Sequence, residues 1–261
     1  MYMAKNLISQ IRNRPRDTTL DPKKLVKMLY SAYEGERSET DFKRKMSFAP
    51  STLGYGHGTC ARYWTIAFSG ADFSQSNSAQ NIASMDSGTD AHSRIQKIFE
   101  KTGILKEVER EIKNNNPPVR GFADVILVVD DKEIVGEIKT IKDSYYLQRE
   151  REGQPSNSHL LQILIYMKVE GIDEGFVLYE NKNTNELLAI PVVMSETNKN
   201  YIDYVFDWMK EVHMAWRNKE HIKRGYTKST WQCKGCPVLE MCNSMDPKGT
   251  KIDNLKVGVD E

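Results

Sequence analysis

The chain has 261 residues, of which 39% are hydrophobic and 28% are charged, and its formal net charge is +1. This balance is ordinary for a globular protein and excludes a globally basic nucleic-acid binder, so any surface of that kind must be local. No apolar run reaches the length of a membrane span and no signal peptide is recognisable, so we expect a cytoplasmic protein without membrane contact. A mitochondrial presequence is the alternative for the polar, basic start.

Residues 1–45 are expected to form an N-terminal helical appendage. Asp21 is placed to cap a helix that begins at Pro22, because proline is tolerated at the first helical position. Four apolar residues recur on one face of this helix: Leu25, Val26, Leu29 and Tyr33.

Loops and a helix are expected next. The glycine-rich stretch 47–64 and the polar stretch 68–81 are predicted as loops, and 87–103 as a helix closed by Gly103. His92, Ile95 and Phe99 share the inner face of that helix. A strand is expected at 107–113, and the "NNNPP" run interrupts the pattern after it.

The segment 121–141, "GFADVILVVDDKEIVGEIKT" and the residue after it, predicts a β-hairpin that turns at Asp130 and Asp131. Tight closure would pair Val129 with Lys132 and place Asp124 opposite Glu137. Both strands are apolar on both faces, which is typical of strands in the middle of a sheet.

The second half of the chain predicts a helix, two strands and a long helix. Residues 159–171 form an apolar helix that ends at Gly171, and strands are expected at 174–181 and 186–193. The amphipathic stretch 198–223 predicts a long helix with these residues inward: Ile202, Val205, Phe206, Met209, Val212 and Trp216.

Three charged residues are set into the apolar hairpin. Glu137 and Lys139 are two residues apart in a strand, so their side chains share a face, and Asp124 lies opposite. An unpaired carboxylate buried there would lose several kcal/mol of solvation, on the order of what a bound divalent cation could offset. The alternative is a structural carboxylate–lysine pair at an exposed rim.

Other residues suited to a metal site lie on two predicted helices. His92 stands on the apolar face of one helix, and Gln162 and Tyr166 stand four residues apart on the other. A lone histidine there is more often an ordinary core residue than a ligand, and a tyrosine that faces a core is ordinary too. It is the order of these residues along the chain that is informative.

Four cysteines are present: Cys60, Cys233, Cys236 and Cys242. Three of them form a CxxCx5C pattern, which in a cytosolic chain favours metal binding over disulfides. Zinc is one occupant, although four-cysteine zinc sites commonly use two CxxC pairs, and here one ligand stands alone.

A basic and aromatic segment, 142–157, follows the second strand of the hairpin. Its lysine and arginines could contact phosphates, and its tyrosines could stack on bases: Lys142, Tyr145, Tyr146, Arg149 and Arg151. Because Glu150 and Glu152 dilute the charge, a solvated loop is an equal alternative. The basic arm with Lys5, Arg12, Arg14 and Arg16 is a further DNA-contact hypothesis.

The ordered motifs together resemble a known family. GxxxH at 88–92, Asp124, ExK at 137–139 and QxxxY at 162–166 follow the order found in PD-(D/E)XK nucleases of the RecB type. Ser51, Leu53 and Cys60 are similar to the N-terminal segment of that family. The cysteine frame is similar to its iron–sulfur members, which include the CRISPR-associated exonucleases and the AddB nuclease domain. Ala123 stands where the family has proline.

The resemblance implies a role for each matching residue. Asp124, Glu137, His92 and the main-chain carbonyl of Ile138 would bind magnesium or manganese, and Lys139 would activate the attacking water. Gln162 and Tyr166 would position DNA or neighbouring groups. The four cysteines would hold a structural 4Fe–4S cluster, with zinc as the chemical alternative.

The sequence therefore predicts an α/β fold of the restriction-endonuclease type, a mixed central sheet flanked by helices. The nuclease domain is expected at 46–243, with a polar tail at 244–261. The resemblance implies an exonuclease acting on single-stranded DNA or free ends, in a bacterial or phage-infected cytoplasm, with recombination or replication proteins as partners. Alternatives are a non-catalytic iron–sulfur or zinc DNA-binding protein and a small-molecule phosphoesterase.

Overall fold

The computed structural model describes residues 21–35, 41–73 and 78–258. These residues belong to two units, one made of the chain up to Ser38 with Ser76–Ser84, and one made of Glu39–Gln75 with Met85–Glu261. Within the described ranges, none of the helices combines the length and the hydropathy needed to cross a lipid bilayer.

The smaller unit contains helix α2, Pro22–Gly35. The side chain of Asp21 accepts hydrogen bonds from the main-chain N–H groups of Lys23 and Lys24, at 2.9 and 3.2 Å. The predicted N-cap is therefore confirmed. The main-chain N–H of Ala79 donates to the carboxylate of Glu34 at 3.4 Å, which joins α2 to the second segment of this unit.

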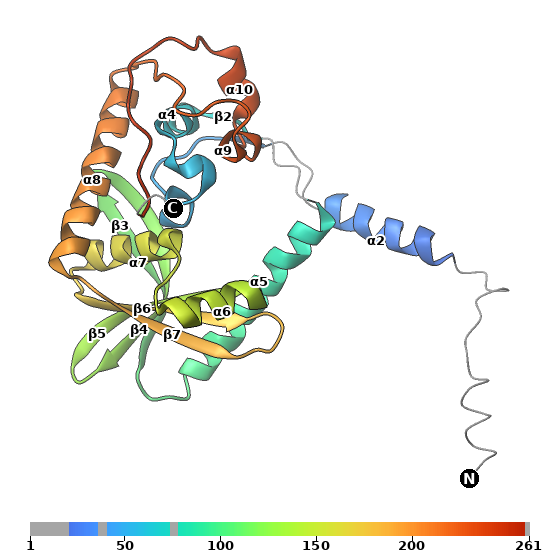
Figure 1. Cartoon of the computed structure of the whole chain (residues 1–261), viewed down its shortest axis with the longest axis vertical. Coiled ribbons are helices and arrows are strands. Elements are labelled where there is room, and N and C mark those ends of the chain that lie inside the picture. The colour runs from blue at the N-terminus through green and yellow to red at the C-terminus, as the bar shows by residue number, and fades with distance from the viewer. Residues whose placement is uncertain (1–20, 36–40, 74–77, 259–261) are drawn as a thin grey trace. The chain divides into compact units, whose positions relative to one another are not determined.

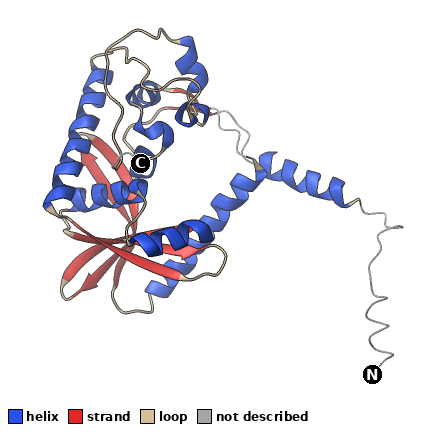
Figure 2. Cartoon of the chain, viewed as in Figure 1, coloured by secondary structure: helices blue, strands red, loops and turns tan. Residues whose placement is uncertain are grey.

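A five-stranded sheet forms the centre of the larger unit, with the strand order β3-β4-β5-β6-β7 (Figure 2). Its strands are β3 Leu105–Asn115, β4 Pro118–Val129, β5 Lys132–Ile141, β6 Glu174–Asn181 and β7 Leu187–Val193. Strands β5 and β6 run parallel and the other neighbours run antiparallel. The predicted mixed sheet, with the apolar hairpin in its middle, is confirmed.

Helices cover both faces of this sheet. Helix α7 (Asn157–Glu170) lies directly on it, and α8 (Glu196–Arg217) and α4 (Ala61–Ser69) pack with α7 around the larger core (Figure 1). On the other face, Ile95 of α5 (Ala79–Phe99) packs on the hairpin residues Val125 and Ile138. The predicted fold class, α/β with a mixed central sheet flanked by helices, is confirmed.

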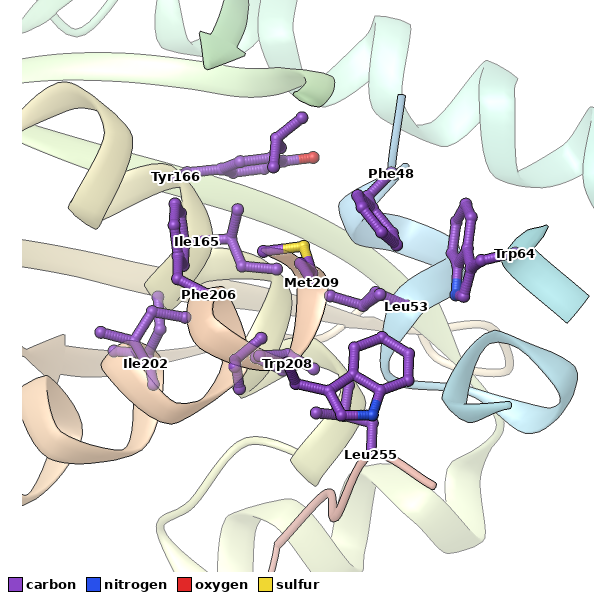
Figure 3. Close-up of a cluster of buried hydrophobic side chains, with 14 of the residues drawn as sticks. Phe48, Leu53, Trp64, Ile165, Tyr166, Ile202, Phe206, Trp208, Met209 and Leu255 are labelled. Carbon is purple, nitrogen blue, oxygen red and sulfur yellow. The ribbon is translucent and has the colours of Figure 1, made fainter. Parts of the chain in front are cut away.

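The larger core joins distant parts of the sequence (Figure 3). Phe48 and Trp64 lie with their ring centroids 4.8 Å apart, and Leu255, close to the end of the chain, is 3% exposed in the same cluster. The main-chain N–H of Leu255 donates to the carbonyl of Thr59 at 2.8 Å. The residues after 243, which were predicted to form a polar tail, thus contribute buried side chains. The predicted division of the chain into domains stays a prediction.

The hairpin register agrees with the prediction. Val129 pairs with Lys132 and Val125 pairs with Gly136, and the turn residues Asp130 and Asp131 have φ angles of 49° and 61°. Both turn residues are therefore left-handed, as a two-residue hairpin turn requires. The paired ladder ends at Val125 and Gly136, one step before Asp124.

Several segments predicted as loops contain regular structure. The stretch 142–157 includes helix α6 (Asp143–Glu152), whose many glutamate, arginine and glutamine residues are good helix formers and which ends at the left-handed Gly153. The stretch 68–81 includes strand β2 (Ala71–Phe73), paired with β1 (Asp41–Lys43), and the start of α5. The stretch 47–64 includes α3 (Pro50–Leu53), the 3-10 helix η1 (Gly56–Thr59) and the start of α4.

The predicted helix 198–223 is too long at its C-terminal end. Helix α8 stops at Arg217, just before Lys219, whose φ of 59° is left-handed and cannot continue a helix. Two short helices follow, α9 (Trp231–Lys234) and α10 (Leu239–Ser244). The guanidinium of the buried Arg62 donates to the carbonyls of Ile222, Asp246 and Cys242, which fastens this C-terminal region to α4.

Candidate active site

Asp124 lies where β4 and β5 separate. Its side chain is buried, and its Oδ2 atom accepts a hydrogen bond of 2.6 Å from the main-chain N–H of Ile138. The Asp124 side chain therefore accepts the N–H of Ile138, which no β4 main-chain carbonyl accepts at this point. The end of the ladder thus leaves room for the Asp124 carboxylate beside β5.

Glu137 is 2% exposed and points toward α7. Its Oε1 atom accepts hydrogen bonds from Gln162 Nε2 at 2.7 Å and lies 2.5 Å from Lys139 Nζ. Its Oε2 atom is buried without a hydrogen-bond partner. Burial raises the pKa of Glu137 to about 7, since desolvation and the charge of Asp124 outweigh the attraction of Lys139.

His92, from α5, approaches the other side of Asp124. Its Nδ1 atom lies 3.4 Å from Asp124 Oδ1. Burial acts to lower the pKa of His92, but the hydrogen bond and the charge of Asp124 outweigh burial, so the pKa is raised. Gln96, one turn further along α5, donates to the carbonyl of Asp124 at 3.0 Å, which holds the helix against β4.

Gln162 and Tyr166 project from α7 one turn apart. The amide nitrogen of Gln162 donates to Glu137 and, at 2.9 Å, to the hydroxyl oxygen of Tyr166. Tyr166 is 2% exposed, and burial, followed by the charge of Glu137, raises the pKa of its hydroxyl well above its ordinary value. The pair therefore fixes the orientation of Glu137.

The predicted catalytic residues thus converge from α5, β4, β5 and α7. No group of three or more His, Cys, Asp or Glu side chains able to hold a metal ion is found within residues 21–35, 41–73 and 78–258. The donor chemistry nevertheless suits a hard cation, since two carboxylates and an imidazole meet here and one carboxylate oxygen is buried without a partner. Binding a cation would require these side chains to turn toward a common point.

A second polar cluster beside the site was not predicted from the sequence. His159 Nδ1 lies 2.9 Å from the hydroxyl of Tyr179, which also accepts from the N–H of Ser156 at 3.1 Å. Burial, with the charges of Lys139 and Arg149, lowers the pKa of His159 to about 3. The sequence spacing could have indicated this cluster, because His159 precedes Gln162 by three residues and therefore lies on the same face of the helix.

The predicted DNA-contact residues have different surroundings. Tyr145 is 59% exposed, whereas Tyr146 is 5% exposed and packs in the core, so its ring cannot stack on a base. Arg149 pairs with Glu152 at 2.7 Å, while Lys142 and Arg151 are exposed. The basic arm with Lys5, Arg12, Arg14 and Arg16 lies outside the described residues.

The cysteines come together from both ends of the larger unit. Cys60 follows η1, Cys233 lies in α9, Cys236 follows α9, and Cys242 lies in α10. Burial raises the pKa of Cys236 to about 12, and the charges of the other three thiols add to the shift. Helix α9 contacts η1 and α10 contacts α4, so the four cysteines lie in one region, although they do not form a ready-made metal site in the described part of the chain.

No protein-family model and no curated protein matches the chain. Among solved structures, the SSO0001 protein is similar with 18% identity and a TM-score of 0.42, over 84% of this chain and 96% of that one. An alkaline exonuclease from Laribacter hongkongensis, LHK-Exo, is similar with 15% identity and a TM-score of 0.44, over 74% of this chain and 95% of that one. Its complex with dAMP gives 14% identity and 0.45 over the same shares. These likenesses are too distant to carry a function over to this chain.

Proposed function

We propose that this protein is a metal-dependent nuclease that hydrolyses phosphodiester bonds in DNA. The observation that carries the proposal is the surroundings of Glu137. This carboxylate is almost fully buried, has one oxygen without a partner, and lies against Lys139 in a cluster that also contains Asp124. A purely structural residue would be expected to satisfy both of its oxygens.

Each residue has a definite task in this reaction. Asp124, Glu137, His92 and the main-chain carbonyl of Ile138 would hold magnesium or manganese, which supplies Lewis acidity and lowers the pKa of water. Lys139 orients the attacking water and offsets the negative charge that develops on the phosphate. Gln162 keeps the carboxylate of Glu137 in place through its 2.7 Å hydrogen bond, and Tyr166 in turn fixes Gln162.

The finer assignment rests on the ordered motifs. GxxxH, Asp124, ExK and QxxxY favour an exonuclease of the PD-(D/E)XK class that prefers single strands or free ends. We place it in the cytoplasm of a bacterium or of a phage-infected cell, in recombination, repair or phage DNA processing. Lys142, Tyr145, Arg149 and Arg151 remain proposed DNA contacts, and recombination or replication proteins remain proposed partners.

The four cysteines are proposed to bind a structural 4Fe–4S cluster, with zinc as the alternative. Sulfur donors suit either occupant. Cys60 lies far in sequence from Cys233, Cys236 and Cys242, so a shared group would close a long loop and stabilise the fold. Cys60 and Cys236 pack against the larger core, where such a cross-link would act.

Degradation of end-labelled DNA tests the proposal. Single- and double-stranded substrates, each labelled at either end, are incubated with the protein in magnesium, in manganese or in EDTA. We expect metal-dependent cleavage that Glu137→Ala abolishes and that Glu133→Ala, a control on the same strand, leaves intact.

The alternatives predict different results. DNA binding without cleavage in either metal would favour the non-catalytic reading. Hydrolysis of a nucleotide ester by a protein that ignores DNA would favour a small-molecule phosphoesterase. Cleavage unchanged in Glu137→Ala would contradict the proposed site.

A further inference from the structure

A groove separate from the carboxylate cluster opens beside the start of α7. Its volume is about 720 Å³, and it is bordered by the α3–η1 connection, the first turn of α7, α9 and residues 253–257. Tyr55, Trp231, Gln232, Asn157, Ser158 and Asn254 contribute to its walls. None of the residues assigned to catalysis lines it.

Two large aromatic side chains are exposed at this groove. Tyr55 is 63% exposed and Trp231 is 56% exposed, with their ring centroids 5.3 Å apart. By contrast, Trp64 and Trp208 are buried. Two neighbouring aromatic rings exposed on the wall of a groove offer a surface on which a flat ligand can stack.

Gly56 permits this arrangement. Its φ of +55° lies in the left-handed region, and a Cβ atom placed there would lie 3.2 Å from the Trp231 ring. A side chain at this position would therefore be strained and would crowd the tryptophan. The loop thus presents Tyr55 beside the Trp231 ring at close range.

Asn254 shapes one wall of the groove. Its side-chain nitrogen donates to the carbonyl of Gly225 at 3.0 Å, and its Oδ1 atom is buried against Gly225, where an added Cβ atom would lie 1.9 Å away. This contact ties residues 253–257 to the segment that contains Gly225, which holds this wall of the groove in place.

The position of the groove relates it to the carboxylate cluster. Ser158 lines the groove, and Gln162, four residues later on α7, donates to Glu137. Four residues of α-helix rise about 6 Å, so the groove begins one helical turn from the residue that holds the carboxylate. Helix α7 therefore carries both a wall of the groove and a residue of the carboxylate cluster.

We propose that this groove binds an unpaired nucleobase of single-stranded DNA by stacking on Tyr55 and Trp231. The inference rests on the proposed nuclease function for the identity of the substrate and adds a site that selects unpaired strands. Bases inside a duplex already stack on their neighbours, whereas an unpaired base leaves its π face free for an aromatic side chain. The groove is lined by one acidic and one basic residue, Asp253 and Lys256, and Asp253 also pairs with Lys251 at 2.9 Å. These charges largely offset one another, so the binding should depend on stacking more than on charge.

Binding without cleavage provides the test. Fluorescence anisotropy in EDTA compares a labelled twelve-nucleotide oligo-dT with an abasic strand of the same length, which has the same phosphates and no bases. We expect the wild-type protein to bind the oligo-dT roughly tenfold or more tightly than the abasic strand. Trp231→Ala and Tyr55→Ala should remove most of this difference, and Trp231→Phe should retain much of it.

Controls separate a lost contact from a lost fold. Leu187→Ala removes a side chain that is also 56% exposed, on the edge strand β7, and should bind like the wild type. Circular dichroism and thermal melting follow the fold of each variant. Tyr55 lies on a different segment from Trp231, so its variant gives the answer if Trp231→Ala does not fold.

The outcomes distinguish this inference from the proposed function. Equal affinity for the two strands, or unchanged binding in folded Tyr55→Ala and Trp231→Ala proteins, would contradict the proposal that the groove binds an unpaired nucleobase. If the same protein still showed metal-dependent cleavage that Glu137→Ala abolishes, the proposed nuclease function would be supported without the binding groove. Binding that depends on stacking, in a protein that never cleaves DNA, would support the binding groove and contradict the proposed nuclease function.

Discussion

The carboxylate of Asp124 replaces the β4 backbone as the hydrogen-bond partner of Ile138, accepting its main-chain N–H at 2.6 Å. The β4–β5 ladder ends one step earlier, at Val125 and Gly136. Asp124 therefore has a structural task as well as its proposed role as a metal ligand. The two tasks can be separated by substitution.

Asp124→Ala should destabilise the protein more than Asp124→Asn. Alanine leaves the buried N–H of Ile138 without an acceptor, which costs about 1–3 kcal/mol, whereas asparagine keeps a carbonyl oxygen at the same place. Urea denaturation measures both variants, and both should lose nuclease activity. Equal stability of the two would show that the hydrogen bond to Ile138 contributes little.

The stability of the metal-free protein should fall as the pH rises through the titration of Glu137. The pKa of this group is raised from 4.5 to about 7, so the folded state holds a proton that the unfolded state has already released. Between about pH 5 and about pH 6.5 the unfolding free energy should decrease by at most about 1.4 kcal/mol per pH unit, and the decrease should end above the folded pKa. Glu137→Gln should remove this contribution, as denaturation in EDTA across the range would show. A slope as steep in the variant as in the wild type would assign the effect to other groups.

Lys139→Met should reduce the rate of DNA cleavage by on the order of a hundredfold or more while leaving DNA affinity nearly unchanged. The ammonium group lies 2.5 Å from Glu137 Oε1, where its charge can act on the reacting phosphate. Single-turnover cleavage and anisotropy measure the two properties separately. Lys132→Met, on the same strand and exposed, is the matched control. A variant that cleaves at the wild-type rate would remove Lys139 from the mechanism.

Gly136→Ala should destabilise the fold by about 1–3 kcal/mol, because it overpacks a close contact. A Cβ atom there would lie 2.4 Å from Phe176 Cζ and 2.5 Å from Val125 Cγ2. Phe176→Leu in the same chain should recover part of the loss, as urea denaturation of the single and double variants would show. Gly88→Ala, where the nearest atom is 3.8 Å away, should cause no comparable loss. Full stability in Gly136→Ala would mean that the strands shift at little cost.

Anaerobically purified protein should contain about four iron atoms per chain and absorb broadly in the visible range. Cys60→Ser and Cys236→Ser should each lower the iron content and the melting temperature, since both residues pack against the larger core. Metal analysis of the same samples detects zinc. One zinc per chain without visible absorbance would favour a zinc site over the 4Fe–4S cluster. A protein without bound metal would contradict both proposals.

The hairpin and its charges could be predicted because alternation and turn chemistry act locally. The left-handed Asp130 and Asp131 set the register, which brings Asp124 and Glu137 together one step beyond the last paired residues. The spacing of two residues along the strand places Glu137 and Lys139 on one face. Gln162 could be assigned to the same site only through the order of the motifs. The pairing of Lys139 with Tyr179 across β5 and β6 depends on a parallel crossover that no local pattern specifies.

The errors have a similar cause. The prediction of a loop at α6 is wrong because its apolar residues do not recur on one helical face, although its charged residues are good helix formers. The burial of Tyr146 results from tertiary packing. Leu255 lies between Ile252 and Val257, which pack in the same core, but this stretch is too short and irregular for a helical or strand periodicity to mark it. The approach of Tyr55 to Trp231 joins segments that are far apart in the sequence and could be found only in the folded structure.

The hydrogen bond from Leu255 to Thr59 bears on how the protein is made. The segment that contains Thr59 is synthesised long before Leu255, with which it shares this hydrogen bond. Contacts between such distant segments form only after the later segment has been made, so the part of the core that contains Leu255 must wait until the chain has been synthesised past residue 255. A nascent chain that stalls before residue 255 would therefore expose apolar surface and become a substrate for chaperones or proteases.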